Sequence, residues 1–205
     1  MPRSSSATWI AWPRASIPET GGRRMTYPLR ALTCPLWRML TIRYQRDPLS
    51  GEGARLHGGR WNAPGQAALY LGTDHATAIA EFYQGLAKPG TLAPYRLKAS
   101  AIADLTDEQG RPADDGVAQA MAAPWKHIAE ITGATPPSWT LAASLIGMGA
   151  QGALVPSAQN PGGTVLVLWH WHRAGEDGEG AALELLDPEG ALSLPRPAIY
   201  LPNKA

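Results

Sequence analysis

The sequence predicts an α+β fold, a single domain with a mixed sheet or split β-sandwich and flanking helices. Short apolar runs typical of strands are interleaved with helix-like segments, without the strict strand–helix–strand alternation of a parallel sheet. The most continuous apolar run, residues 164–171, is typical of a strand in the middle of a sheet. With 205 residues, of which 44% are hydrophobic, the chain is long enough to bury one proper core.

The N-terminal segment, residues 1–24, is expected to be a disordered or dispensable extension. It contains four arginines against one glutamate and has neither helical nor strand periodicity. A transit-like leader is an alternative, but its hydrophobic piece, residues 9–12, is too short for a secretory signal. Met25 offers a plainer explanation, that the start codon was assigned too far upstream and the domain occupies residues 25–205.

Charge and cysteine content narrow the classes of partner. A formal net charge of +1 gives no basic field for direct binding of nucleic acid or of an anionic membrane. The single cysteine, Cys34, excludes an intrachain disulfide and indicates a reducing, cytoplasmic location. Because no apolar run approaches the roughly 20 residues of a membrane-spanning helix, we expect a soluble protein.

The first element expected in the domain is a strand or strand-turn at residues 36–46. Its apolar residues are mixed with three arginines, of which Arg38 and Arg43 would lie on different sides. From the residues alone, these arginines are expected to lie on the surface. Residues 48–53, PLSGEG, are typical of a turn that brings the chain round to the next motif.

That motif is a glycine-flanked arginine followed by a short strand. Gly58 and Gly59 allow a sharp turn or a close approach of the backbone to a ligand. Arg60 follows them, and its planar guanidinium is well suited to hold a phosphate or a carboxylate. The apolar run at residues 67–71 predicts a buried strand, with Tyr70 at its end, where a ring can stack and still offer a hydroxyl.

A helix is expected directly after this strand. Asp74 is a good N-cap, and Lys88, Pro89 and Gly90 are expected to end the helix. Six apolar residues fall on one side: Ala76, Ile79, Ala80, Tyr83, Leu86 and Ala87. Glu81 lies away from that stripe, with Thr77 and Gln84, so the pattern alone makes it a solvated helix glutamate.

The rest of the chain predicts one more long strand, three helical segments and a final group of strands. We expect a strand at 91–105, a polar loop at 107–116 and helical pieces at 117–122, 125–132 and 139–148, the last capped by Ser138. Trp125 and Trp139 are expected to pack rather than to contact a ligand. Strands follow at 153–155, 164–171 and 182–186.

Two motifs in this part are set aside on physical grounds. Residues 147–152 match GxGxxG, but they follow a helix and precede a strand, the reverse of a dinucleotide-binding turn. His170 and His172 have strand spacing, which would place both on one face, but no third ligand occurs at a suggestive spacing. We therefore expect a helix C-cap at the glycines and no metal.

The stretch GGRWNAPG, the strand with tyrosine and the helix with glutamate resemble the RES domain family. The resemblance extends to residues 38–56 and to LVPSAQN at 154–160, and it covers roughly residues 36–186. It implies a fold like that of ADP-ribosyltransferases and a function as the toxin half of a type II toxin–antitoxin pair. It also implies that NAD is consumed and that a helix-turn-helix antitoxin is the partner.

The resemblance assigns catalytic roles to Glu81, Arg60 and Tyr70. Cleavage of the nicotinamide–ribose bond leaves positive charge on the ribose. The Glu81 carboxylate would either stabilise this charge or orient the ribose hydroxyl and the incoming nucleophile. Arg60, together with Arg38, would bind the pyrophosphate of NAD.

Three residues would hold the nicotinamide itself. Tyr70 would stack on it or confine it, while Ser157 and Asn160 would bind it through hydrogen bonds. On its own a serine at the end of a strand is more often a turn hydroxyl, and no GxSxG elbow indicates a hydrolase.

The acceptor of ADP-ribose stays open between a protein, with ribose-phosphate pyrophosphokinase among those modified in the family, and water or phosphate. The long segment PLSGEGARLHGGRWN favours protein modification. An alternative of another class is a non-catalytic module that binds NAD or a partner helix.

Overall fold

The computed structural model describes residues 27–190 and 192, so the extension expected at residues 1–24 lies outside the described residues. The elements are β1 (Arg30–Thr41), η1 (Ile42–Tyr44), α1 (Glu52–His57), β2 (Leu69–Gly72), α2 (His75–Tyr83), β3 (Gly90–Asp104), α3 (Asp115–Ala122), η2 (His127–Thr132), α4 (Pro137–Gly147), β4 (Gly152–Pro156), β5 (Thr164–Leu168), β6 (Trp171–Arg173) and β7 (Ala181–Leu185). Here η1 is a 3-10 helix and η2 is a π-helix. No helix in the described part of the chain combines the length and hydrophobicity needed to cross a bilayer.

The strands form one sheet that closes on itself. The strand order is β1-β2-β5-β4-β3-β7-β6, and a further pairing of β1 with β3 completes the closure. Strand β3 makes this possible, because its 15 residues pair with β1 on one edge and with β7 and then β4 on the other. The predicted α+β class with a mixed sheet is confirmed, since β3–β4 and β6–β7 are parallel and the other pairs are antiparallel. The strands of the described residues belong to one sheet, which differs from the split sandwich given as the alternative.

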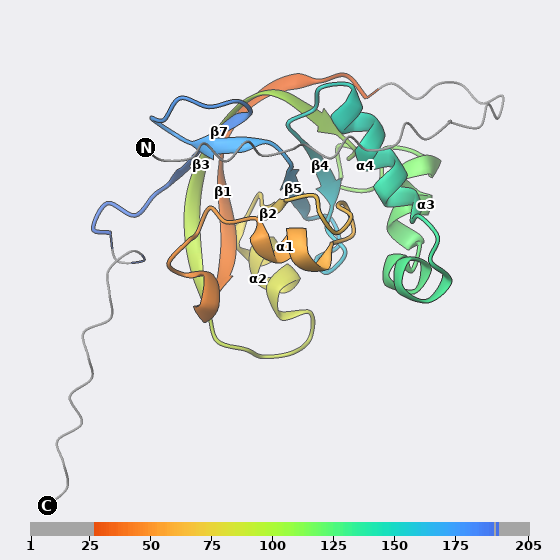
Figure 1. The fold of residues 1–205 in the computed structure, drawn as a ribbon, viewed down its shortest axis with the longest axis horizontal. Helices are drawn as coiled ribbons and strands as arrows, with labels where there is room; N and C mark the ends of the chain where they lie inside the picture. Colours follow the sequence, from red (N-terminus) through yellow and green to blue (C-terminus); the bar gives the residue numbers. More distant parts are fainter. Residues whose placement is uncertain (1–26, 191, 193–205) are drawn as a thin grey trace, which may run out of the picture.

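Both faces of the central strand β5 are buried, as its apolar sequence predicted. Leu166 and Leu168 join a core cluster with residues of β1, β2, β3 and β7. Val165 and Val167 join a second cluster with residues of α3 and α4. Figure 1 shows α3 and α4 side by side at the right of the sheet, whereas α2 lies apart from them, in the lower part of the view. The second cluster packs α3 and α4 against the sheet.

The strand expected at 164–171 is interrupted. The amides of Trp169 and His170 both donate to the Gln151 carbonyl, and this bends the chain after Leu168. A separate strand, β6, then pairs with β7. The two histidines therefore do not share one regular strand, because His170 lies in the bend.

Helix α4 begins two residues earlier than expected, at Pro137, with Pro136 in the N-cap position. Ser138, the expected cap, is instead buried inside the first turn and its hydroxyl has no hydrogen-bond partner in the described structure. The glycine-rich segment after α4 is a helix end and turn that leads into β4, as its position in the sequence predicted.

Helix α2 is shorter than predicted and turns a different face inward. Asp74 caps it as expected, but the helix ends at Tyr83 because Gln84 adopts the left-handed conformation. Its buried residues are Thr77 and Ala78, whereas Ile79 from the predicted apolar stripe is 36% exposed. Since residues three and four apart share a helix face, Glu81 follows these two inward instead of facing solvent.

Candidate active site

A cavity of about 620 Å³ opens beside the sheet, within the size range of small-molecule sites. It is lined by β1, the loop after α1, β2, α2, the loop after β4 and the segment leading into η2. Among the residues predicted for the site, Arg38, Arg60, Tyr70 and Glu81 line this cavity. Ser157 and Asn160 do not line it but lie directly behind, where they contact residues of α2.

The Glu81 carboxylate is held by the loop that follows β4. Its Oε1 accepts hydrogen bonds from the Ser157 hydroxyl at 2.7 Å, the Ala158 amide at 2.8 Å and the Gln159 amide at 3.3 Å. Within the described residues Oε2 has no hydrogen-bond partner. One oxygen therefore fixes the carboxylate, while the other is available to a ligand in the cavity.

The loop is in turn fixed to α2 through Asn160. The Asn160 side-chain amide donates to the Thr77 hydroxyl at 2.9 Å, and that hydroxyl donates to Asp74 at 2.6 Å. The Asn160 backbone amide also donates to the Ser157 hydroxyl at 2.9 Å. In this structure Asn160 supports the site from behind, and its direct contact with nicotinamide, expected from the sequence, stays a prediction.

Arg60 connects the cavity to the end of α3. Its Nη1 donates to the carbonyl oxygens of Met121 at 2.8 Å, Ala123 at 3.0 Å and Ala120 at 3.5 Å. A cation is favoured at this position because the C-terminal carbonyls of a helix carry partial negative charge. Burial lowers the pKa of Arg60, and the nearby negative charge of Glu81 opposes this shift. Nε and Nη2 make no hydrogen bond to any described residue.

The Tyr70 hydroxyl is used within the protein. It donates to the Asn62 side-chain oxygen at 2.7 Å and accepts from the Trp61 amide at 3.1 Å. Gly59 packs so tightly here that a Cβ would collide with the Tyr70 hydroxyl. Burial raises the pKa of Tyr70, so the phenol stays neutral. The ring is a wall of the cavity, and its hydroxyl shapes the loop that carries Arg60.

Arg38 combines a structural role with its place in the cavity. Its Nη1 donates to the carbonyl oxygens of Pro48 at 3.1 Å and Ser50 at 3.3 Å, which fixes the turn before α1. Tyr95 donates to the same Pro48 oxygen at 2.9 Å, and burial raises the pKa of Tyr95 to about 12. Burial lowers the pKa of Arg38, because the charged guanidinium has lost part of its hydration.

Several lining residues were not singled out as site residues in the sequence: Trp37, His57, Phe82, Gln84, Trp125, Lys126, Glu130 and Gln159. His57 and Gln159 adjoin the motifs, so proximity in sequence was a usable signal for them. Trp139 packs as expected, and its indole donates to the Gly59 carbonyl at 2.8 Å. Trp125 packs beside it, with ring centroids 6.3 Å apart, but it also lines the cavity.

These features define a class of site. A carboxylate with one free oxygen shares a cavity with two arginines and several aromatic rings. Such a site can bind an anionic ligand that carries a flat ring and can stabilise positive charge developing on a sugar.

The family follows from comparison with known proteins. A model of the RES domain matches residues 35–187, most of the chain, so this protein belongs to the RES domain family. The chain is 35% identical to Toxin Res of Yersinia enterocolitica over 69 residues, which cover 34% of this chain and 45% of that toxin. It is 42% identical to the Prs ADP-ribosylating toxin of a Sphingobium species over 52 residues, 24% of this chain and 32% of that toxin.

A third relative is the NAD(+) phosphorylase MbcT of Mycobacterium bovis, 36% identical over 92 residues, or 38% of this chain and 50% of that enzyme. The matched segments thus span half or less of these relatives. A solved structure, the Mycobacterium tuberculosis MbcT–MbcA toxin–antitoxin complex, contains a chain that matches at a TM-score of 0.51 and 24% identity. The match covers 78% of this chain and 85% of that one. This likeness is one of fold.

Proposed function

We propose that the protein is the toxin of a type II toxin–antitoxin system, which cleaves NAD and transfers ADP-ribose to a cellular protein. The observation that carries this proposal is the Glu81 carboxylate, fixed through Oε1 and free at Oε2, in a cavity with Arg60. Relatives named as an ADP-ribosylating toxin and an NAD(+) phosphorylase support NAD as the substrate.

In this proposal the reaction proceeds through a ribose cation. The bond between the ribose C1′ and the nicotinamide nitrogen breaks, and nicotinamide leaves with the electron pair as a neutral molecule. Glu81 Oε2 stabilises the positive charge or binds a ribose hydroxyl beside it. The acceptor then attacks C1′ and gives up its proton to water. Because the Ser157 loop already fixes the carboxylate, little reorganisation is needed as charge develops.

The other predicted residues bind and position the dinucleotide. Arg60, through Nε and Nη2, and Arg38 would hold the pyrophosphate, while the Tyr70 ring would confine the nicotinamide. Ser157 orients Glu81 by its hydrogen bond, and Asn160 holds the Ser157 loop on α2. No metal is needed for these steps.

The proposed partners are a helix-turn-helix antitoxin that covers the cavity and a protein that accepts ADP-ribose. The structural match to a toxin–antitoxin complex supports an antitoxin partner. A second candidate function is an NAD phosphorylase or glycohydrolase, in which phosphate or water replaces the protein acceptor, and the relative named NAD(+) phosphorylase favours the phosphate form.

The test is to incubate the purified protein with NAD labelled in its adenosine part, with buffer alone, with phosphate or with a bacterial lysate. Free nicotinamide and the label are followed together by mass spectrometry. Nicotinamide release with label on a discrete protein supports the transferase. Label in ADP-ribose or its 1″-phosphate identifies the glycohydrolase or phosphorylase. Absence of nicotinamide release under all three conditions contradicts the proposal and favours a module that only binds.

A further inference from the structure

One wall of the cavity takes no part in the proposed chemistry. The segment between α3 and α4 contributes Trp125, Lys126 and Glu130 to the lining. None of these side chains is needed to cleave the nicotinamide–ribose bond or to orient Glu81. A wall with an aromatic ring, an ammonium and a carboxylate is nevertheless equipped to recognise a second part of the ligand.

This wall is tied firmly to the glycine–arginine loop. The Arg60 guanidinium binds the carbonyls of Met121 and Ala123, and the Trp125 amide donates to the same Ala123 carbonyl at 2.8 Å. From the other side, the Trp139 indole binds the Gly59 carbonyl at 2.8 Å. The position of Trp125 relative to Arg60 is therefore fixed by hydrogen bonds to the shared Ala123 carbonyl and by packing of the Trp125 ring against Trp139.

The order of groups along the cavity follows from these contacts. Arg60 lies close enough to Glu81 for the two opposite charges to attract each other, and its guanidinium also donates a hydrogen bond to the end of α3. Trp125 and Lys126 come directly after that end of α3. A ligand that places its reacting ribose at Glu81 and its pyrophosphate at Arg60 would thus extend its remaining half toward Trp125.

Lys126 differs from the two arginines in how its charge is used. Arg38 and Arg60 each donate to backbone carbonyl oxygens, whereas the Lys126 ammonium lies 5.5 Å from the centroid of the Trp125 ring. It forms no salt bridge with any described residue. An exposed ammonium beside an aromatic ring is suited to pair with a phosphate while the ring stacks on a base.

Glu130 lies four residues beyond Lys126, in the π-helix η2. A carboxylate here would repel a phosphate but would accept hydrogen bonds from the two hydroxyls of a ribose. Acidic side chains bind the adenosine ribose in this way in other dinucleotide sites, where they also disfavour a 2′-phosphate. The residue types on the wall thus match adenine, phosphate and ribose in turn.

We propose that Trp125, Lys126 and Glu130 form the subsite for the adenosine half of the substrate. Trp125 stacks on the adenine, Lys126 binds the adjacent phosphate and Glu130 binds the ribose hydroxyls, which selects NAD over NADP. This inference rests on the proposed function, because it takes the cavity to be an NAD site.

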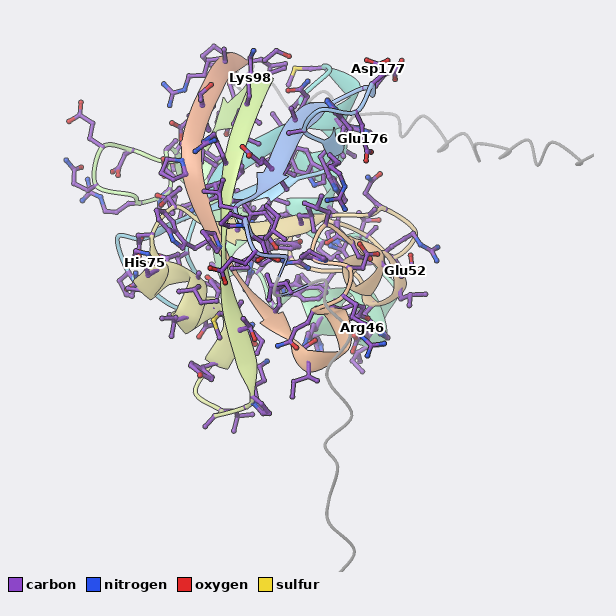
Figure 2. The ribbon with its side chains drawn as sticks, turned by 90° about the vertical axis from the view of Figure 1, so that its left-hand side faces the viewer. Arg46, Glu52, His75, Lys98, Glu176 and Asp177 are labelled. Carbon is purple, nitrogen blue, oxygen red and sulfur yellow. The ribbon has the colours of Figure 1, made fainter. Side chains whose placement is uncertain are left out.

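The test uses ADP-ribose, which lacks the nicotinamide, as a probe of binding by the full chain in calorimetry. Lys126→Gln and Trp125→Ala are each expected to weaken binding about 10-fold, and Trp125→Phe is expected to retain most of it. Lys98→Gln is the matched control, because Lys98 is exposed on β3 and does not line the cavity. In Figure 2 Lys98 lies near the top of the molecule, away from His75 at the start of the cavity-lining helix α2. Thermal melting of each variant separates lost binding from lost folding.

A second readout is the release of nicotinamide from NAD and NADP. Wild-type protein should release nicotinamide faster from NAD than from NADP. Glu130→Gln should lower the ratio of these two rates about 10-fold, since it removes the charge that repels the 2′-phosphate. Suppose that the wild-type protein cleaves NAD but that Lys126→Gln and both Trp125 variants bind ADP-ribose as tightly as it does. That result would contradict the adenosine subsite and leave the proposed function intact. Wild-type protein that neither releases nicotinamide nor binds ADP-ribose would contradict the proposed function and the subsite with it.

Discussion

The two walls of the cavity are built in different ways. On the sheet side, Glu81 is fixed by hydrogen bonds from Ser157 and two backbone amides, and the loop that supplies them is anchored on α2 by Asn160. On the helical side, Lys126 immediately precedes the short π-helix η2 and Glu130 lies within it, and neither forms a salt bridge with any described residue. Arg60 contributes to both walls.

This difference suits one wall to catalysis and the other to substrate binding. A group that stabilises charge in a transition state must be oriented beforehand, because reorganisation during the reaction raises the barrier. A group that binds a distant part of the substrate needs an available charge more than a fixed orientation. Substitutions on the sheet wall should therefore lower the rate constant, whereas those on the helical wall should weaken binding.

The largest effect is expected for Glu81→Gln. The amide oxygen can still accept the hydrogen bonds from the Ser157 loop, so the fold should persist, but the charge is lost. Nicotinamide release should fall about 100-fold or more, with the loss in kcat. Glu108→Gln, in an exposed loop, is the control. If Glu81→Gln kept wild-type kcat, the sheet wall would not be the catalytic one.

A smaller loss of rate is expected for Ser157→Ala. It removes one of the three donors to Glu81 Oε1 and leaves the amides of Ala158 and Gln159. Because a hydrogen bond to a charged group contributes about 1.5–3 kcal/mol, we expect kcat to fall roughly 10-fold with little change in KM. Ser157→Thr, which keeps the hydroxyl, should restore most of the rate; a rise in KM alone would assign Ser157 to substrate binding.

Arg60→Lys should affect both walls together. An ammonium cannot reproduce the planar guanidinium that reaches the carbonyls of α3 and also faces the cavity. We expect KM for NAD to rise about 10-fold. With a loss of about 1 kcal/mol of stability, Tm should fall by roughly 2–4 °C. An unchanged Tm, measured by calorimetry, would show that Arg60 does not hold the helical wall in place.

The smallest effect concerns the cap of α2, which supports the sheet wall. Burial by itself raises the pKa of Asp74, but hydrogen bonds from Thr77 and the Ala76 amide together outweigh it and lower the pKa below its ordinary value. A lowered pKa in the folded state means that the charge stabilises the protein above the unfolded pKa. This contribution disappears as pH falls through the folded pKa.

We therefore compare unfolding of wild-type protein and Asp74→Asn between pH 7 and pH 3. Asparagine keeps the capping acceptor without the charge, so the wild-type advantage should be within about 1 kcal/mol at pH 7 and should vanish near pH 3. A difference that stays constant with pH would exclude the charge of Asp74 as its origin.

Sequence reasoning succeeded where local signals decide the outcome. The alternation in residues 91–105 predicted β3, and Asp74 predicted the start of α2. The glycine–arginine motif, the tyrosine strand and the glutamate helix identified three residues that line one cavity, Arg60, Tyr70 and Glu81. These signals depend on periodicity, on capping and on a motif that lies within a short stretch of the chain.

Prediction from the sequence was wrong where tertiary contacts override the local pattern. The apolar stripe of α2 predicted that Glu81 would face solvent, but the buried Thr77 hydroxyl is satisfied by Asp74 and Asn160, which turns that face inward. Trp125 and Lys126 were not identified as lining residues because their place depends on Arg60, more than sixty residues earlier, binding the end of α3.

We propose that NAD binds in this cavity with its reacting ribose at Glu81. The most direct measurement is a crystal structure of the Glu81→Gln variant grown with saturating NAD, in which slow cleavage preserves the intact dinucleotide. We predict that the nicotinamide ribose lies within hydrogen-bond distance of the side chain at position 81, with the pyrophosphate at Arg60. NAD bound outside the cavity, or a cavity without NAD at saturating concentration, would contradict this binding site.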